Sequence, residues 1–250
     1  MDMTTHYIIL SSSYSHGDRI CLDYVDDIYC ASKDIVKIQT VCGEDVAISF
    51  YSVITRGEDW NSVRFADKFF DGVRKIDNVD EFINEINNDR QSTALDLARY
   101  ILSKVGQCTH LKLQKLLYFC YADYLCATGE KLFEDDKICA ITYGPVVSNI
   151  CDMLKGTYGN LTQEDLFDEE DKYLPEFTYL PARSRIMFTR NGNRKLMSID
   201  RTLSIYGDMN QYELVNLTHR DNSPWAVTKS RNGHRIYDEV IKNYHKFETI

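Results

Sequence analysis

Proline and glycine are scarce in this sequence, with 4 and 12 among 250 residues, and no internal repeat or low-complexity tract occurs. With 44% hydrophobic side chains the chain can bury a core, which argues against disorder as its main state. No apolar run approaches the length of a membrane span, and the N-terminus lacks the basic start and apolar core of a signal peptide. We therefore expect a cytoplasmic protein with no membrane partner.

Metal-binding patterns are also missing. The eight cysteines form no C-x-x-C pair, and Cys108 with His110 is too sparse for a zinc site. Scattered cysteines at apolar positions are typical of buried thiols in a reducing compartment. Asp23, Asp26 and Asp27 carry carboxylates that can hold a divalent cation, but without further ligands a solvated loop is favoured. The sequence predicts no bound metal and no disulfide framework.

Catalytic motifs are absent in the same way. The chain has no phosphate-binding P-loop, zinc-protease helix motif, nucleophile elbow or dinucleotide fingerprint. His219-Arg220-Asp221 resembles the kinase catalytic triplet, but no glycine-rich loop or D-F-G accompanies it. The six histidines are spread singly. We expect a protein that is not an enzyme and uses no cofactor, with His219 as the best candidate if a hydrolase site is assembled from distant residues.

The two parts of the chain differ in net charge. Residues 1–91 carry 17 acidic and 9 basic side chains, a net charge of −8, and residues 92–250 carry 21 and 20, a net charge of −1. The polar stretch at 87–92 is a natural boundary, so we predict an acidic accessory domain at 1–91 and a second domain at 92–250. An acidic first domain repels nucleic acid.

Residues 1–91 have the pattern of a small α+β module rich in β-hairpins. Strands are expected at 7–10 and 20–25, and a second hairpin is expected from 35–41 and 46–54 around Gly43. A further strand is predicted within 69–76. Asn78, with Glu81 three residues on, predicts a capped helix that closes the module.

Residues 92–250 show helical periodicity. The most regular helix is expected at 110–127, capped by Thr109 and ended by Gly129. Other helices are predicted from Thr93 to Gly106, after an extended segment at 138–143 with Gly144 and Pro145 in the first turn, at 199–206, from Asn210, and at 236–247. The overall expectation is an α+β fold, with a mostly α-helical second domain that contains a short β-hairpin.

That hairpin is predicted at 186–197, around a type I′ turn at Asn191-Gly192. Six basic residues lie in 183–201, after an acidic cluster in 163–171. The basic cluster suits a phosphate backbone or an acidic partner, whereas a surface hairpin neutralised by its acidic neighbour is an equal alternative.

Several short segments then occur in a fixed order: K-L-Q-K-L-L-Y at 112–118, G-E-K-L-F at 129–133, A-I-T-Y-G-P-V at 140–146, Y-G-D and E-L within 206–214, and T-H…P-W at 218–225. Over about residues 94–247 this set resembles the Panacea (SocA-like) antitoxin domain family. Ile141 stands where the family often has an aromatic residue, and 172–198 looks like an insertion. Residues 1–90 lie outside the resemblance.

The resemblance implies a mostly helical domain that is encoded in bacteria or phages beside a toxin, binds that toxin protein and neutralises it without catalysis. Some relatives are thought to deliver the toxin to a protease, so a proteolytic adaptor is one alternative. A nucleic-acid-binding regulator that uses the basic hairpin at 183–201 is another, against which the net charge of −9 argues. The acidic first module is expected to present a negative face to a basic toxin surface.

The resemblance also nominates partner-binding residues, which are Lys112, Gln114, Lys115, Tyr118, Tyr143, Gly144, Pro145, His219 and Trp225. The polar members on the helix at 110–127 lie off its apolar stripe, so we expect them on an outer face. Charge reversal at Lys112 and Lys115 is then expected to weaken toxin binding without unfolding. Trp225 suits an interface anchor, although such a residue is more often part of a core.

Overall fold

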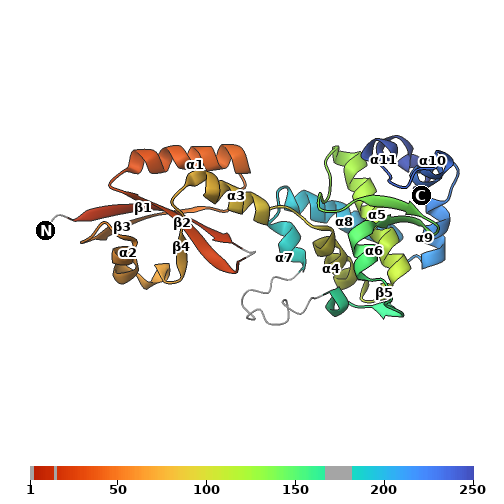
Figure 1. Cartoon of the computed structure of the whole chain (residues 1–250), viewed down its shortest axis with the longest axis horizontal. Coiled ribbons are helices and arrows are strands. Elements are labelled where there is room, and N and C mark those ends of the chain that lie inside the picture. Colours follow the sequence, from red (N-terminus) through yellow and green to blue (C-terminus); the bar gives the residue numbers. More distant parts are fainter. Residues whose placement is uncertain (1–2, 14–15, 167–181) are drawn as a thin grey trace. The chain divides into compact units, whose positions relative to one another are not determined.

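The computed structural model describes residues 3–13, 16–166 and 182–250, and it divides into two compact units, Met1–Gln91 and Ser92–Ile250 (Figure 1). The first unit combines a 4-stranded sheet with helices, and the second unit is mostly helical, so the predicted α+β class is confirmed. In the part of the chain that is described, no helix is both long and apolar enough to cross a membrane.

The first unit is built on a 4-stranded sheet with the order β3-β1-β2-β4. Its strands are β1 (Thr4–Ser13), β2 (Asp18–Val25), β3 (Ser49–Thr55) and β4 (Val73–Lys75). The long central strand β1 pairs antiparallel with β2 and β3, and β4 adds to β2 in parallel. The strands expected at 7–10 and 20–25 are thus confirmed as the central pair.

Helices cover both faces of this sheet (Figure 1). α1 (Ile28–Cys42) and α3 (Val79–Asp89) lie on one face, and α2 (Trp60–Ala66) with a 3-10 helix (Lys68–Phe70) lies on the other. Because successive strand residues point to opposite faces, Ile9 packs under α1 and α3 while its neighbours Ile8 and Leu10 pack under α2. The unit therefore has two small cores, one on each side of the sheet.

The predicted hairpin of 35–41 with 46–54 is wrong, because residues 28–42 form α1. Asp27 caps this helix by accepting the N–H of Cys30 at 2.9 Å, and Ala31, Ile38 and Cys42 are buried at helical spacing. The β-branched side chains of 35–41 favour a strand locally, but packing on the sheet overrides that preference. The strand expected within 69–76 shrinks to β4, after the 3-10 turn.

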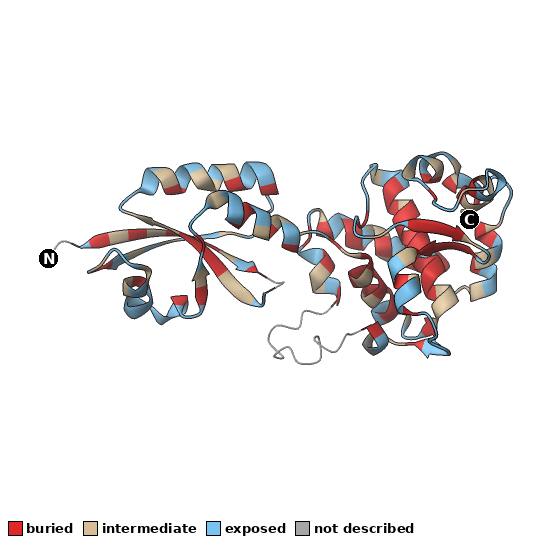
Figure 2. Ribbon diagram, in the orientation of Figure 1, coloured by how far each residue is buried: buried red, intermediate tan, exposed pale blue. Residues whose placement is uncertain are grey.

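The second unit is organised around α5 (His110–Thr128). Twelve of its 19 residues are buried, on all sides of the helix and not on one stripe (Figure 2). The remaining helices are α4 (Ala94–Val105), α6 (Ser148–Met153), α7 (Ala182–Met187), α8 (Gly192–Tyr206), α9 (Gln211–Thr218), α10 (Pro224–Ser230) and α11 (Asp238–Tyr244). Short 3-10 turns occupy Gln163–Leu166 and His245–Phe247.

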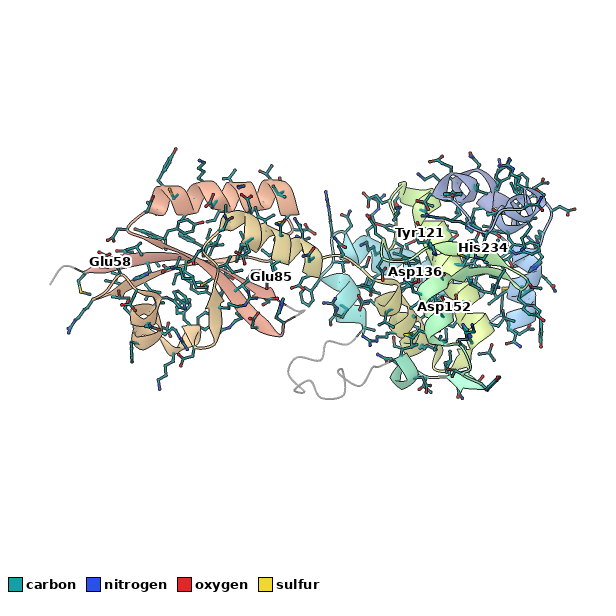
Figure 3. All side chains as sticks on the ribbon, in the orientation of Figure 1. Glu58, Glu85, Tyr121, Asp136, Asp152 and His234 are labelled. Atoms are coloured by element: carbon teal, nitrogen blue, oxygen red, sulfur yellow. The ribbon has the colours of Figure 1, made fainter. Side chains whose placement is uncertain are left out.

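The described part of this unit also contains two small strand pairs. β6 (Ile138–Ile141) and β7 (Gly144–Val147) form a tight antiparallel hairpin, and β5 (Cys108–Thr109) pairs with β8 (Asn160–Leu161). The hairpin packs directly on α5. Asp136 (labelled in Figure 3) accepts the N–H of Asn149 at 2.8 Å and so satisfies the start of α6 next to the hairpin.

The predicted helix ends of this unit are largely confirmed. Thr93 and Asp96 form a reciprocal capping box on α4, and Asn210 and Glu213 form another on α9. Thr109 accepts the N–H of Lys112 at the start of α5, and the helix ends at Gly129 in the left-handed conformation. Local capping chemistry needs no tertiary information, which is why these ends are readable from sequence.

Two local expectations fail in the second unit. The segment 186–197 is the end of α7 and the start of α8 and not a hairpin, and the part of the expected insertion at 172–181 lies outside the described residues. Asn191 does adopt the left-handed conformation, at φ 57°, but it joins two helices. Gly144 and Pro145 begin strand β7 instead of a helix, and Pro145 lies opposite Ala140 in the hairpin.

Candidate partner-binding site

The polar members of the nominated set on α5 are interior residues, contrary to the expected outer face. Gln114, Lys115 and Tyr118 are each at most 1% exposed. The outer-face prediction fails because α5 is surrounded by α4, α8, α9, α11 and the hairpin, so both sides of its apolar stripe are covered. Charge reversal at Lys115 is therefore expected to unfold the unit and cannot probe a partner surface.

Gln114 and Lys115 attach the β6–β7 hairpin to α5. Gln114 Oε1 accepts the N–H of Val147 at 2.8 Å, and Lys115 Nζ donates to the carbonyl oxygen of Pro145 at 2.7 Å. Burial lowers the pKa of Lys115 to about 7, opposed in part by Cys151 and Glu248. Strand β7 is thus held at two points by buried hydrogen bonds, which fixes the hairpin on the central helix.

Gly144 makes this close approach feasible. Its φ is 99°, and a Cβ atom there lies 2.7 Å from Thr218 Oγ1 and 3.0 Å from Lys115 Cε. A side chain at this position therefore collides with α5 and α9 at once, in a backbone conformation that L-residues disfavour.

Gly144→Ala is expected to lower the free energy of unfolding by about 2 kcal/mol, because left-handed strain and overpacking add. The measurement is chemical denaturation of both variant and wild type. Gly129→Ala is the matched control, since Gly129 has φ 78° but no atom within 4 Å of its added Cβ. The control is expected to lose about 1 kcal/mol, from strain alone. Equal losses in the two variants are the result that contradicts the steric account.

Tyr118 belongs to a second buried polar cluster. Its hydroxyl donates to Glu248, and the His245 ring contacts Glu248 through Nδ1 at 2.8 Å and Asp123 through Nε2 at 2.7 Å. Asp123 also accepts from Thr202 at 2.6 Å. We call Tyr118, Asp123, His245 and Glu248 the carboxylate–histidine cluster. It ties the C-terminal segment to α5, and sequence analysis nominated only its tyrosine.

Three nominated residues do gather at one place, the turn between β6 and β7. Trp225 Nε1 donates to the carbonyl oxygen of Ile141 at 2.7 Å. His219 Nδ1 donates to Val215 at 2.7 Å, its Nε2 lies 3.3 Å from the carbonyl oxygen of Thr142, and its ring centre is 3.8 Å from that of Trp225. Next to them Tyr143 is 64% exposed. We call Tyr143, His219 and Trp225 the hairpin-turn site.

The geometry at His219 bears on the hydrolase alternative. Both ring nitrogens face backbone carbonyl oxygens, so the ring is held in place as a support for the turn. A general base needs a nitrogen free to accept a proton from a reacting group. The arrangement therefore favours the structural role for His219, with Tyr143 as the exposed member of the site.

Lys112 occupies a different surface. It lines a groove of about 500 Å³ together with Lys104, Asp200 and Asp208, where the end of α4 meets the end of α8. It also lines a smaller hollow with Gln211 and Tyr212 at the start of α9. Of the nine nominated residues, then, one lies on this groove, three form the hairpin-turn site, and five are buried, four of them at the hairpin and Tyr118 in the carboxylate–histidine cluster.

The basic cluster at 183–201 is divided by the helices that replace the hairpin. Lys195 is buried, and its Nζ donates to Ser92 Oγ at 2.8 Å. Arg185 lies 3.5 Å from the carboxylate of Asp96, while Arg183, Arg190, Arg194 and Arg201 are exposed. The nucleic-acid alternative rested on a basic hairpin, and that hairpin does not form.

The candidate metal ligands of the first unit have structural partners. Asp23 contacts His6 at 2.9 Å, Asp26 accepts the N–H of Thr5 at 2.8 Å, and Asp27 caps α1. Burial raises the pKa of the Cys108 thiol to about 11, which opposes the thiolate that a metal requires. Within the described residues, no group of three or more His, Cys, Asp or Glu side chains is arranged to hold a metal ion.

The second unit is thus a mostly helical domain in which Gln114 and Lys115 hold a hairpin on a buried central helix and the exposed side chain of Tyr143 lies at the hairpin turn. Residues 113–226 match the family model "Antitoxin SocA-like, Panacea domain". This stretch runs from α5 into α10, includes the hairpin-turn site, and confirms the resemblance inferred from sequence. The match covers none of the first unit, and no curated protein or solved structure matches the chain.

Proposed function

We propose that the chain is an antitoxin that binds a cognate toxin protein in the cytoplasm and neutralises it by direct contact, without catalysis. The observation that carries this proposal is the Panacea match over residues 113–226. The arrangement of His219 adds support, because its ring nitrogens are engaged with backbone carbonyls.

The toxin contact is assigned to the hairpin-turn site. Tyr143 projects an exposed aromatic side chain from a two-residue turn, and the turn is held from beneath by Trp225 and His219. Buried bonds from Gln114 and Lys115 fix β7, the strand that follows the turn. A tyrosine on a fixed turn costs little backbone entropy on binding, and tyrosine is enriched among the residues that dominate interface energies.

Co-expression with the protein encoded by the neighbouring open reading frame tests the proposal. That protein is expected to arrest growth alone, to be harmless with this chain present, and to co-purify with it in a defined ratio. Its half-life is expected to stay unchanged, since neutralisation is by binding. A shortened half-life assigns the adaptor role instead, and a neighbour that is harmless alone or stays toxic and unbound refutes the antitoxin proposal.

A further inference from the structure

The two edges of the sheet in the first unit differ in a way that the antitoxin role does not explain. The β4 edge has three residues, two of them charged, and Arg74 pairs there with Asp18 at 2.8 Å and with Glu85 (labelled in Figure 3). The β3 edge has 7 residues, S-F-Y-S-V-I-T, none of them charged. Short charged edges resist pairing with other strands, whereas long uncharged ones accept it.

Among the residues that the structure describes, β3 is hydrogen-bonded on one side only, to β1 (Figure 1). Its side chains on one face of the sheet, Phe50, Ser52 and Ile54, are exposed, with Phe50 at 45% and Ile54 at 59%. Phe50 stacks on Tyr7 of β1 with ring centres 6.2 Å apart, so the apolar surface extends from β1 to the edge. Backbone groups on the outer side of β3 and this apolar strip are therefore available together.

The sequence of β3 is complementary to itself when read in opposite directions. In an antiparallel pair centred on Ser52, Phe50 lies opposite Ile54 and Tyr51 lies opposite Val53 of the other strand. Ser49 then faces Thr55, and Ser52 faces Ser52. Aromatic residues opposite β-branched residues, and hydroxyl side chains opposite one another, are favourable cross-strand pairs. This register pairs all 7 residues, and a strand that matches itself is the requirement for a two-fold interface.

We propose that β3 pairs antiparallel with β3 of a second copy of this chain, with Ser52 on the two-fold axis, so that the sheets of two first units become one continuous sheet. The charge distribution supports this location of the interface. The first unit has a net charge of −8, and two such units can meet through β3 because this strand carries no charge. A single strand pair is a small interface, so the dimer is expected to dissociate in roughly the micromolar range.

Sedimentation equilibrium of the full chain and of two variants at the axis tests this dimer. The wild type is expected to be dimeric at roughly 100 μM, well above a micromolar dissociation constant. Ser52→Lys and Ser52→Glu are each expected to raise that constant about tenfold or more, because two like charges then face each other. An equal mixture of the two variants is expected to restore the dimer, because opposite charges then meet on the axis. Because Ser52 is exposed, both variants are expected to fold, and circular dichroism verifies this.

Ser32→Lys is the matched control, because Ser32 is an exposed serine on α1 of the same unit, and this variant is expected to remain dimeric. Added salt is expected to strengthen the wild-type dimer by screening the repulsion between the acidic units. A monomeric wild type, or variants and mixture that associate like the wild type, overturns the proposal. So does a Ser52→Lys variant that loses toxin binding while its own association is unchanged, since the edge then accepts a strand of the toxin.

Discussion

Replacing His245 by phenylalanine is expected to lower the free energy of unfolding by about 3 kcal/mol or more near neutral pH. The His245 side chain is 5% exposed and sits between the carboxylates of Asp123 and Glu248. Phenylalanine preserves the ring that packs edge-on against Tyr118, so the substitution removes the charge and the hydrogen bonds more than the volume. It leaves Glu248, which is fully buried, without its cation, and an unpaired buried charge is the costly outcome.

The double variant His245→Phe/Glu248→Gln separates charge pairing from packing. The amide removes the orphaned charge and still offers an oxygen to the Tyr118 hydroxyl, so the double variant is expected to be more stable than the single variant. Chemical denaturation of the wild type, of His245→Phe and Glu248→Gln alone, and of the double variant measures this difference. A double variant that loses as much stability as both substitutions summed contradicts the electrostatic account of the cluster.

The same comparison has a defined pH dependence. Burial by itself lowers the pKa of His245, but hydrogen bonds to Asp123 and Glu248 outweigh it and raise the pKa to about 9. A histidine whose pKa is raised by folding contributes stability that is complete below pH 6.5 and is lost as the pH rises through about 9. The advantage of the wild type over the double variant is therefore expected to shrink between pH 7 and 9, and a constant difference across that window refutes the raised pKa.

The pH dependence is measured as a difference between wild type and double variant because Lys115 changes the stability with pH in the direction opposite to His245. Burial lowers its pKa to about 7 from 10.5, so the unfolded chain binds more protons in between, and the stability contributed by neutral Lys115 grows as the pH rises. In wild-type protein alone the two slopes oppose each other above pH 7. Lys115 is common to wild type and double variant, so its contribution cancels in the comparison.

The parts of the fold that sequence predicts well are those decided locally. The caps at Thr93, Thr109 and Asn210 and the ends at Gly106 and Gly129 involve side chains and backbone groups within a few residues of one another. Where two local patterns compete, the outcome depends on distant partners. Residues 35–41 are rich in β-branched side chains, yet Ile38 is buried against the sheet as part of α1. The dipeptide Asn191-Gly192 is compatible both with a tight hairpin turn and with the turn between two helices.

The candidate site, too, is predictable where short motifs identify it and unpredictable where distant residues meet. The family motifs identify the residues around the hairpin turn, but periodicity cannot show that α5 is covered on all sides, so Lys115 and Tyr118 are placed on the surface in error. His245 and Glu248 have no distinctive motif, and the spacing of a histidine and a glutamate three residues apart occurs by chance. Their role depends on Asp123, which lies 122 residues before His245 and is brought to it by packing alone.

Tyr143→Ala is expected to weaken toxin binding about 30-fold or more, the effect of removing an interface residue worth 2 kcal/mol or above. Tyr143 is 64% exposed, so the stability of the free protein is expected to change by less than about 0.5 kcal/mol. Titration calorimetry with the purified toxin measures the affinity, and growth rescue on co-expression measures neutralisation.

Tyr212→Ala is the control that makes this result specific. Tyr212 is 67% exposed in the same unit, so both substitutions remove the same side chain from a similar surface position. Tyr212, however, lines the hollow beside Lys112 at the start of α9 and is not part of the hairpin-turn site. Loss of binding in Tyr143→Ala with normal binding in Tyr212→Ala places the toxin at the hairpin turn. The reverse pattern places it at the Lys112 groove, in which case the nine nominated residues mark the right domain but the exposed aromatic turn is not its contact surface.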